Sequence, residues 1–249
     1  MIALDIENVC LTLGGTPVLD DVSLHVAEGE FVSILGPSGC GKSSLFRLMT
    51  GALVADSGTI RVHGAPLSGA SRAFAFMPQR DALMPWRRII DNVTLGLEVQ
   101  GMDRDAARAK IRPLFATFGL GGFENHYPAQ LSGGMRQRAA LMRTIVQDRP
   151  IQLLDEPFGA LDALTRAGMQ RWLEQRWQGA RWTTALVTHD VREAVALSDR
   201  IYVLSPRPAR IIAEFEVPDP RPRLGRALSQ AAVRLEAELL DTLLTQNGD

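Results

Sequence analysis

The segment Gly36-Pro37-Ser38-Gly39-Cys40-Gly41-Lys42-Ser43 decides the fold of this chain. It follows the apolar run 30–35 and leads into residues 44–49, whose apolar side chains recur at helical spacing. A strand, a glycine-rich loop and a helix in this order are the context in which the pattern G-x-x-x-x-G-K-[S/T] binds phosphate. The sequence therefore predicts that the chain binds a nucleoside triphosphate.

The parts of this loop have separate expected roles. Backbone N–H groups of the loop and of the following helix start would bind phosphate oxygens. Lys42 would reach the β- and γ-phosphates and take part in catalysis, and the hydroxyl of Ser43 would help to hold Mg²⁺. The expected nucleotide contacts are Gly36, Pro37, Ser38, Gly39, Cys40, Gly41, Lys42, Ser43 and Ser44.

The composition restricts the class of protein. Of 249 residues, 46% are hydrophobic and 22% are charged, as in an ordinary soluble globular protein, and the net charge of −1 provides no basic field for nucleic acid. Two cysteines are too few for a disulfide framework. The N-terminus lacks the regions of a signal peptide, and no apolar stretch reaches the ~18 residues that span a bilayer. We expect a cytoplasmic protein that binds no nucleic acid and reaches a membrane only through a partner.

The order of strand-like and helical patterns predicts an α/β fold with an inserted helical block. Strand-like runs occupy residues 4–13, 22–26, 31–35, 59–62, 151–154, 184–187 and 200–204. Between them, the alanine- and charge-rich segment 104–112 is typical of an exposed helix. We therefore divide the chain into two halves of a nucleotide-binding core, residues 1–88 and 149–215, and a helical block at 89–148.

The C-terminal segment carries two signals. Prolines at positions 206, 208, 218, 220 and 222 predict an irregular, extended tail after Leu204. A helix is expected from Leu224 to Leu244, because the leucines at 224, 228, 235 and 239 would lie near one face. We expect residues 216–249 to form a short helical extension that packs on the chain's own core; a partner-binding surface is the alternative.

Two further strands end in residues suited to phosphate chemistry. The run 151–154 is followed by Asp155, which could hold Mg²⁺, and by Glu156, which could accept a proton from the attacking water. His189 emerges where the run 184–187 ends, a position that suits a sensor of the γ-phosphate. Buried strands often end in a solvated acidic residue that has no functional role. Asp155 and Glu156 are therefore candidates for function only because the phosphate loop lies upstream.

The segment Leu131-Ser132-Gly133-Gly134-Met135-Arg136-Gln137 predicts a second helix start that faces an anion. Ser132 is a good N-cap, and Gly133 and Gly134 permit close approach of a ligand. The segment belongs to the helical block and is distinct from the loop at Gly36. The two segments therefore need not contact the same nucleotide within one chain. An ordinary loop-to-helix junction is the alternative on composition alone.

Over roughly residues 2–212 the chain resembles the ATP-binding subunit of an ABC transporter. Six segments occur in the family's order: the phosphate loop, Gln79 in Met77-Pro78-Gln79 (glutamine loop), residues 131–137 (signature), Asp155-Glu156-Pro157 (Mg²⁺-binding and catalytic acids), Ala160-Leu161-Asp162 (D-loop) and Thr188-His189-Asp190 (histidine switch). The resemblance implies a P-loop NTPase fold with a RecA-like core, an antiparallel β subdomain within residues 1–88 and a helical subdomain that carries the signature.

The resemblance also implies a shared site. Two cassettes would form a head-to-tail homodimer that holds ATP between the phosphate loop of one chain and Ser132, Gly133 and Gly134 of the other. Asp162 would contribute to the same nucleotide site.

The implied activity is ATP hydrolysis coupled to transport, with ATP and Mg²⁺ as ligands. Glu156 would act as general base, and His189 would contact the γ-phosphate. Ser43 and Asp155 would hold Mg²⁺. Gln79 would join the metal or its water and report to a membrane subunit.

Three segments narrow the kind of transporter. Residues 80–87, 158–166 and 204–208 resemble ATP-binding subunits of importers for nitrate, sulfonate or taurine, and of importers for pyrimidine or flavin-type vitamin precursors. This implies separate permease subunits, a periplasmic or extracellular solute-binding protein, and a peripheral position on the cytoplasmic face of the inner (plasma) membrane. The alternatives are a soluble ABC ATPase outside transport and the ATPase subunit of an exporter.

Two single residues lead to specific expectations. An exposed Trp86 would suit a socket for a permease helix, because tryptophan buries a large area at such contacts; the alternative is a Trp86 in the core of its own subdomain. Leu13 lies where the family usually stacks adenine on an aromatic residue, so we expect weaker nucleotide binding or looser base selection than usual.

Overall fold

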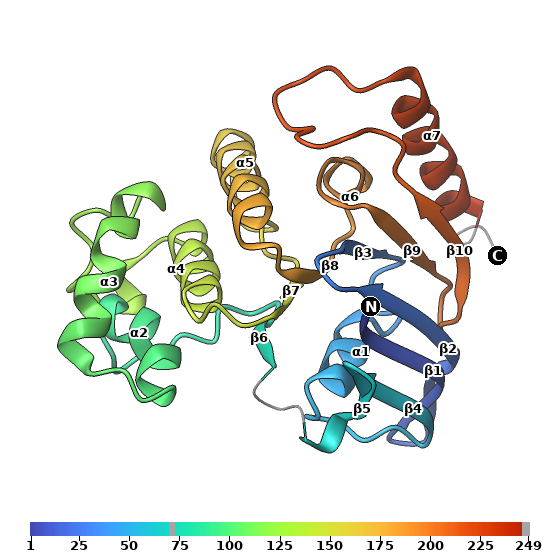
Figure 1. Cartoon of the computed structure of the whole chain (residues 1–249), viewed down its shortest axis with the longest axis horizontal. Helices are drawn as coiled ribbons and strands as arrows, with labels where there is room; N and C mark the ends of the chain where they lie inside the picture. Colours follow the sequence, from blue (N-terminus) through green and yellow to red (C-terminus); the bar gives the residue numbers. More distant parts are fainter. Residues whose placement is uncertain (70–72, 246–249) are drawn as a thin grey trace.

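The computed structural model describes residues 1–69 and 73–245, which form two β-sheets and the helices around them (Figure 1). The strands are β1 (Ile2–Leu13), β2 (Thr16–Ala27), β3 (Phe31–Leu35), β4 (Ser57–Val62), β5 (Ala65–Pro66), β6 (Phe74–Met77), β7 (Ile151–Asp155), β8 (Thr183–Val187), β9 (Arg200–Leu204) and β10 (Ile211–Glu216). The helices are α1 (Lys42–Met49), α2 (Ile89–Val99), α3 (Arg104–Thr117), α4 (Gly133–Ile145), α5 (Ala163–Ala180), α6 (Val191–Leu197) and α7 (Gln230–Thr245), with 3₁₀ turns at Leu67–Gly69 and Pro128–Gln130. Within these described ranges, no helix has both the length and the apolar character that crossing a membrane requires.

The smaller sheet is antiparallel, with the strand order β2-β1-β4-β5. Gly14 and Gly15 form the turn between β1 and β2, and their φ values of 55° and 80° are ones that an L side chain rarely adopts. Along β1, Leu4 and Ile6 are buried whereas Glu7 is exposed, which is the period of two expected for a sheet with one solvent face. This sheet is the antiparallel β subdomain that the resemblance implied.

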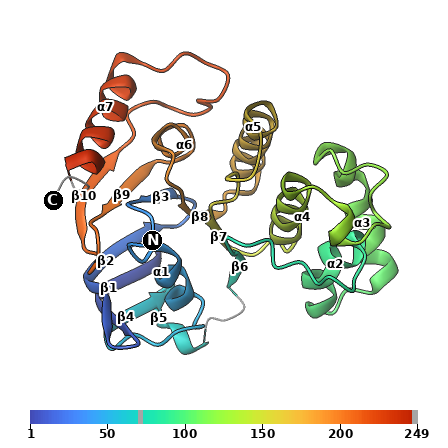
Figure 2. The same ribbon diagram turned by 180° about the vertical axis from the view of Figure 1, so that it is seen from behind.

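The larger sheet has the order β10-β9-β3-β8-β7-β6 and is parallel except for β10. All five residues of β3 are buried, and successive side chains point to opposite faces. Phe31 packs edge-on against Trp177 of α5, with ring centroids 6.1 Å apart, while Val32 and Ile34 belong to the core around α1. Figure 2 shows α5 and α1 on opposite sides of this sheet, as an α/β core requires.

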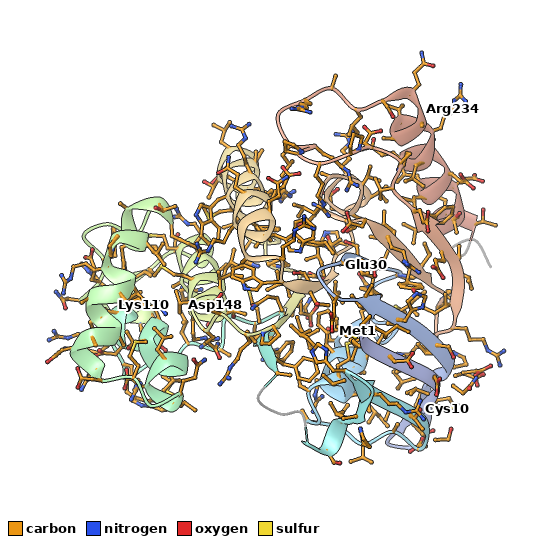
Figure 3. All side chains as sticks on the ribbon, in the orientation of Figure 1. Met1, Cys10, Glu30, Lys110, Asp148 and Arg234 are labelled. Atoms are coloured by element: carbon orange, nitrogen blue, oxygen red, sulfur yellow. The ribbon has the colours of Figure 1, made fainter. Side chains whose placement is uncertain are left out.

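Three helices, α2, α3 and α4, form a block between β6 and β7 in sequence that lies to one side of the sheets (Figure 1). Its apolar core is continuous with that of the main sheet, since Leu141 of α4 and Leu154 of β7 belong to one buried cluster. Side chains fill the space between α4 and α5, and Lys110 marks the outer helix α3 in Figure 3. The block is therefore joined to the core by packing as well as by the chain.

The C-terminal segment differs from its prediction in two places. Residues Ile211–Glu216 form the edge strand β10 rather than an irregular tail, because the prolines flank this stretch and leave it free to pair with β9. α7 begins at Gln230 rather than at Leu224. Gly225 has a φ of 87°, which ends any earlier helix, and the hydroxyl of Ser229 accepts a hydrogen bond from the N–H of Ala232 at 3.1 Å and so caps α7.

The C-terminal helix packs on its own core. Its buried side chains share a cluster with residues of β3, β9 and α6: they are Ala232, Leu235 and Leu239. The chain leading to α7 is held by Arg221, whose guanidinium lies 4.2 Å from the ring centroid of Trp177 and whose Nε is 2.9 Å from Oδ1 of Asp199. The extension is thus an integral part of the fold.

Replacing Leu239 with alanine should lower the free energy of unfolding by about 2–5 kcal/mol, because the side chain is fully buried and its loss leaves a cavity. Leu240→Ala is the matched control: the neighbouring side chain is 50% exposed, and we expect a change within about 0.5 kcal/mol. Urea denaturation followed by circular dichroism measures both variants. Equal effects would contradict the packing of α7 on the core.

Candidate active site

Parallel strands bring the predicted polar residues to one edge of the main sheet. β3, β8, β7 and β6 are neighbours in that order. Their carboxyl ends lead into Gly36, His189, Asp155–Glu156 and Gln79, respectively. Because parallel strands end at the same edge, residues from four distant parts of the sequence meet there.

Two glycines of the phosphate loop lie close to neighbouring strands. A Cβ added to Gly41 would lie 2.9 Å from Cδ2 of Leu19, and a Cβ added to Gly36 would lie 3.0 Å from the carbonyl oxygen of Leu204. The loop therefore packs directly against β2 and the end of β9. Lys42 turns back over the loop, where its Nζ donates to the carbonyl oxygens of Gly36 at 2.7 Å and Pro37 at 2.8 Å.

A pocket of about 200 Å³ opens over this loop. Its lining residues are Ser38, Gly39, Gly41, Lys42, Ser43, Ser44, Gln79, Glu156 and Arg207. All of them except Arg207 were expected at the site from the sequence. Gly36 and Pro37 shape the loop beneath the pocket, and the side chain of Cys40 is buried. Arg207 belongs to no motif with an assigned role, so only the fold reveals its position.

Asp155 is a buried carboxylate at the end of β7. Burial, together with the neighbouring charge of Glu156, raises its pKa to about 6, although a hydrogen bond from Ser43 and the charge of Lys42 oppose the rise. Its Oδ1 is buried without a hydrogen-bond partner among the residues described. An unused acidic oxygen beside a serine hydroxyl suits Mg²⁺, which prefers oxygen ligands. The residues present therefore fit this metal ion.

Glu156 and His189 face each other across the ends of β7 and β8. Nδ1 of His189 lies 3.6 Å from Oε1 of Glu156. The backbone of Glu156 has a φ of 49°, a strained value for a non-glycine residue, and its N–H donates to the carbonyl oxygen of Val187 at 2.8 Å. The side chain of His189 is 63% exposed, so a ligand arriving from solvent can reach it.

The signature segment approaches this loop from the helical block. The side-chain Nε2 of Gln137 donates to the carbonyl oxygen of Glu156 at 2.6 Å, and its Oε1 accepts from the N–H of Ala160 at 2.6 Å. Gln137 thus connects α4 to the loop that carries Glu156. The sequence pattern assigned no such role to Gln137, because both contacts are to backbone groups of a distant segment.

The other signature residues lie apart from the phosphate loop. Ser132 caps α4 by accepting a hydrogen bond from the N–H of Met135 at 3.2 Å. Ser132, Gly133 and Gly134 are not among the residues that line the phosphate-loop pocket. Asp162 caps α5 by accepting from the N–H of Thr165 at 3.0 Å. Each chain therefore presents two separate surfaces with helix starts that suit an anion.

This arrangement agrees with the comparison with known families. The family model described as ABC transporter matches residues 19–159, which is more than half of the chain. The chain belongs to the ABC transporter family.

Relatives of this cassette include ATP-binding proteins of import systems. The taurine import ATP-binding protein of Yersinia pestis bv. Antiqua is 41% identical over 214 residues, which cover 86% of this chain and 84% of the relative. The aliphatic sulfonates import ATP-binding protein of the same organism is 43% identical over 240 residues (96% and 85%). The formylaminopyrimidine import ATP-binding protein of Halalkalibacterium halodurans is 45% identical over 203 residues (82% and 79%).

A solved structure supports the same fold. A dimeric ATP-binding cassette in a post-hydrolysis state, bound to ADP and phosphate, superimposes with a TM-score of 0.79 and 28% identity, over 87% of this chain and 99% of that chain. The predicted P-loop NTPase fold is confirmed, and the chain is an ATPase of the ABC family.

In this cassette the segment after Gln79 is attached to the signature helix. Arg143 of α4 donates to the carbonyl oxygens of Asp81 at 2.7 Å and Ala82 at 2.6 Å. Arg136 of the same helix pairs with the carboxylate of Asp81 at 3.0 Å. A movement of Gln79 would therefore be transmitted to α4 through its neighbours.

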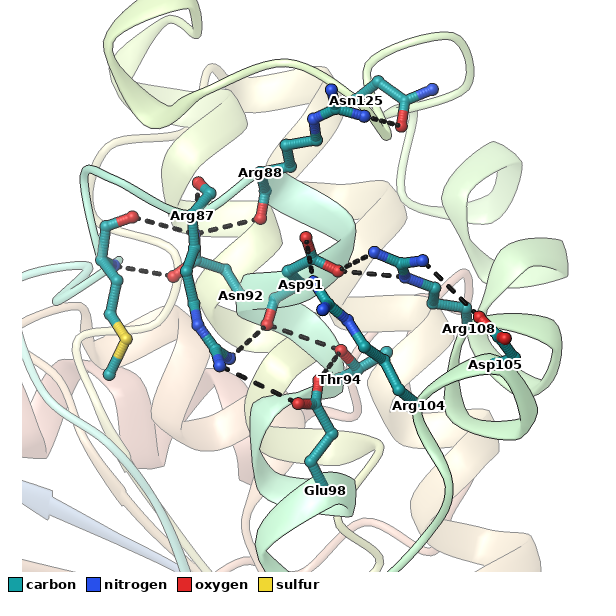
Figure 4. Close-up of polar contacts among 11 residues, drawn as sticks. Arg87, Arg88, Asp91, Asn92, Thr94, Glu98, Arg104, Asp105, Arg108 and Asn125 are labelled. Carbon is teal, nitrogen blue, oxygen red and sulfur yellow. Dashed lines mark hydrogen bonds and ion pairs between the residues drawn. The ribbon is translucent and has the colours of Figure 1, made fainter.

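The following turn is held by one buried amide. Oδ1 of Asn92 accepts from the N–H of Met84 at 2.7 Å, and its Nδ2 donates to the carbonyl oxygens of Met84, Arg87 and Arg88 at 3.0–3.2 Å (Figure 4). Trp86 lies within this turn and is 73% exposed. The alternative interpretation, a Trp86 in the subdomain core, is wrong, because the turn directs the side chain to solvent. The role of Leu13, which ends β1 and is 37% exposed, stays a prediction.

Glu193 of α6 is a buried acidic residue next to the histidine-switch segment 188–190. Burial and the charge of Asp190 raise its pKa to about 7, although hydrogen bonds with Thr188 and Gln170 and the charge of Arg166 oppose the rise. Its pKa therefore lies well above the ordinary value of 4.5.

This shift predicts a pH-dependent stability. Unfolded Glu193 ionises near pH 4.5 but the folded residue keeps its proton to about pH 7, so the free energy of unfolding should fall as pH rises through that window. The slope is at most about 1.4 kcal/mol per pH unit, and Glu193→Gln should abolish this component. Unfolding free energies measured between pH 4 and pH 8 test this, with Glu238→Gln on the exposed face of α7 as control. Parallel pH profiles for the wild type and Glu193→Gln would contradict it.

Proposed function

We propose that this ABC ATPase supplies energy for the import of a small solute through separate permease subunits. The observation that carries the proposal is the rigid, exposed turn at Trp86, which lies close in sequence to Gln79 of the nucleotide pocket. The relatives named for import of taurine, aliphatic sulfonates and formylaminopyrimidine support it. The solute is accordingly a sulfonate or a pyrimidine-type vitamin precursor. An external solute-binding protein and a peripheral position on the cytoplasmic face of the inner membrane belong to the same proposal.

The pocket supports hydrolysis by an in-line attack of water on the γ-phosphate. Lys42 exchanges its contacts with the loop carbonyls for the β- and γ-phosphates. Glu156 accepts the proton of the attacking water while the bond from the γ-phosphorus to the bridging oxygen breaks, and His189 donates a hydrogen bond to the γ-phosphate. Ser43, Asp155 and Gln79 would hold Mg²⁺, and the ion would supply positive charge that offsets the negative charge of the phosphates.

The complete site is shared between two copies of the chain. In each copy Ser132, Gly133 and Gly134 lie outside that copy's own phosphate pocket. A head-to-tail pair would place them, with Asp162, against the γ-phosphate held by the partner's phosphate loop, and the dimeric form of the similar cassette supports this arrangement. ATP then closes the pair, and hydrolysis allows it to open.

Lys42→Ala and Glu156→Gln should separate binding from turnover. Lys42→Ala removes a phosphate contact and should weaken ATP binding, whereas Glu156→Gln should bind ATP but hydrolyse it roughly 10²–10⁴-fold more slowly. Light scattering after gel filtration should find Glu156→Gln as a dimer with Mg·ATP and Lys42→Ala as a monomer. A monomeric Glu156→Gln at saturating ATP would contradict the shared site.

Trp86→Ala should weaken the complex with the permease, because a large exposed aromatic side chain at a contact often contributes about 2 kcal/mol or more. Val233→Ala, at an exposed position of α7, is the control for a surface apolar residue. Affinity purification of the tagged chain from native membranes, followed by identification of the bound proteins, measures the effect. Recovery with ribosomes or DNA, or no membrane protein in the wild-type sample, would contradict the importer role.

A further inference from the structure

We propose that Arg207 is a nucleotide-binding residue that contacts the phosphates of ATP. The inference deepens the proposed function and depends on nucleotide binding at the loop 36–43. Arg207 belongs to the loop 205–210, which joins β9 to the edge strand β10. Its side chain lines the same pocket as Lys42, Ser43 and Glu156.

The loop that carries Arg207 contacts the phosphate loop at its start and β2 near its end. At its start, Leu204 packs closely on Gly36: a Cβ added to Gly36 would lie 3.0 Å from the carbonyl oxygen of Leu204. Near its end, the N–H of Ala209 donates to the carbonyl oxygen of Val18 at 2.9 Å, and the carbonyl oxygen of Ala209 accepts from the N–H of Asp20 at 3.0 Å. These contacts hold the loop between the phosphate loop and β2.

A hydroxyl fixes the shape of the loop from within. Oγ of Ser205 accepts from the N–H of Arg210 at 3.0 Å and donates to the carbonyl oxygen of Pro206 at 2.9 Å. The position of the Arg207 backbone is therefore set by the fold. A fixed backbone limits the conformational entropy that the loop itself loses when Arg207 binds an anion.

The two arginines of this loop differ in their partners. Arg210 is paired, since its Nε donates to Oδ2 of Asp20 at 3.1 Å. Arg207 is exposed, and neither an ion pair nor a hydrogen bond occupies its guanidinium within residues 1–69 and 73–245. Lys42 and Arg207 are the two cations that line the pocket, and Lys42 is hydrogen-bonded to loop carbonyls. Arg207 is thus a guanidinium available to an anion, and guanidinium groups bind phosphate in a bidentate manner.

The lining of the pocket indicates which part of the nucleotide Arg207 contacts. Gln79 and Glu156 share the pocket with Arg207, and both act near the γ-phosphate in the proposed mechanism. Leu13, at the expected adenine position, is not among the lining residues. We therefore assign Arg207 to the β- and γ-phosphates rather than to the base, so its contribution should grow with the number of phosphates.

Equilibrium binding of ATP, ADP and AMP in the presence of Mg²⁺, measured by calorimetry, tests this assignment. Arg207→Ala should raise the Kd for ATP roughly tenfold, as expected for one charge-assisted contact, and change the Kd for AMP less than twofold. Arg207→Lys should recover part of the ATP affinity. Arg210→Ala removes the same charge from the same loop but outside the pocket, and should leave all three affinities within twofold.

Three outcomes separate this inference from the proposed nucleotide site. If Lys42→Ala weakens ATP binding but Arg207→Ala does not, the inference about Arg207 is wrong and the site stands. If Arg207→Ala weakens ATP, ADP and AMP equally and lowers the melting temperature without ligand, Arg207 only supports the loop and the inference is again wrong. If Lys42→Ala also leaves ATP binding unchanged, the nucleotide site itself is misplaced and both proposals fail.

Discussion

The parallel hydrogen-bond ladder of β3, β8 and β7 is the constraint on which the site depends. Val187, the last residue of β8, is in register with Ile34 of β3 on one side and with Asp155 of β7 on the other. These strands are buried, so their backbone groups must pair with one another rather than with water. The pairing places Asp155 in this row of paired residues, and Glu156, Gly36 and His189 one or two residues beyond it. A shift in register of one residue would turn each strand's side chains to the opposite face of the sheet.

Burial near this edge of the sheet also raises the pKa values of two acidic residues. Asp155 and Glu193 both have raised pKa values because the sheet edge and α6 exclude water from their carboxylates. Asp155 has a buried oxygen without a hydrogen-bond partner among the described residues, and a cation at this oxygen would offset the cost of its charge. Glu193 instead interacts with Thr188 and Gln170, next to the strand end that carries His189. Burial thus makes ionisation of both carboxyl groups less favourable in the folded chain than in water.

Helix α4 connects the nucleotide pocket with the exposed surface. Its Gln137 holds the loop of Glu156, and its Arg136 and Arg143 hold the segment that follows Gln79. Because these contacts are made by one helix, α4 links the loop of Glu156 to the segment that leads from Gln79 to Trp86. The turn itself is stiffened by Asn92, so it would move as a unit rather than deform. This is a physical route by which ATP binding could act on a partner in the membrane.

The sequence by itself determined the chemistry that is local in the chain. The loop ending in Lys42 and Ser43 indicates a phosphate site, because the glycines, the lysine and the helix start lie in one continuous segment, and strand ends at Asp155 and His189 follow from short apolar runs. Only the tertiary structure decided that Arg207 lines the pocket, that Gln137 holds the loop of Glu156 and that Trp86 is exposed. It also decided that α7 starts at Gln230 and that residues 211–216 pair as a strand. These features depend on contacts between residues far apart in the chain, and no local period or spacing encodes which distant segment a side chain will meet.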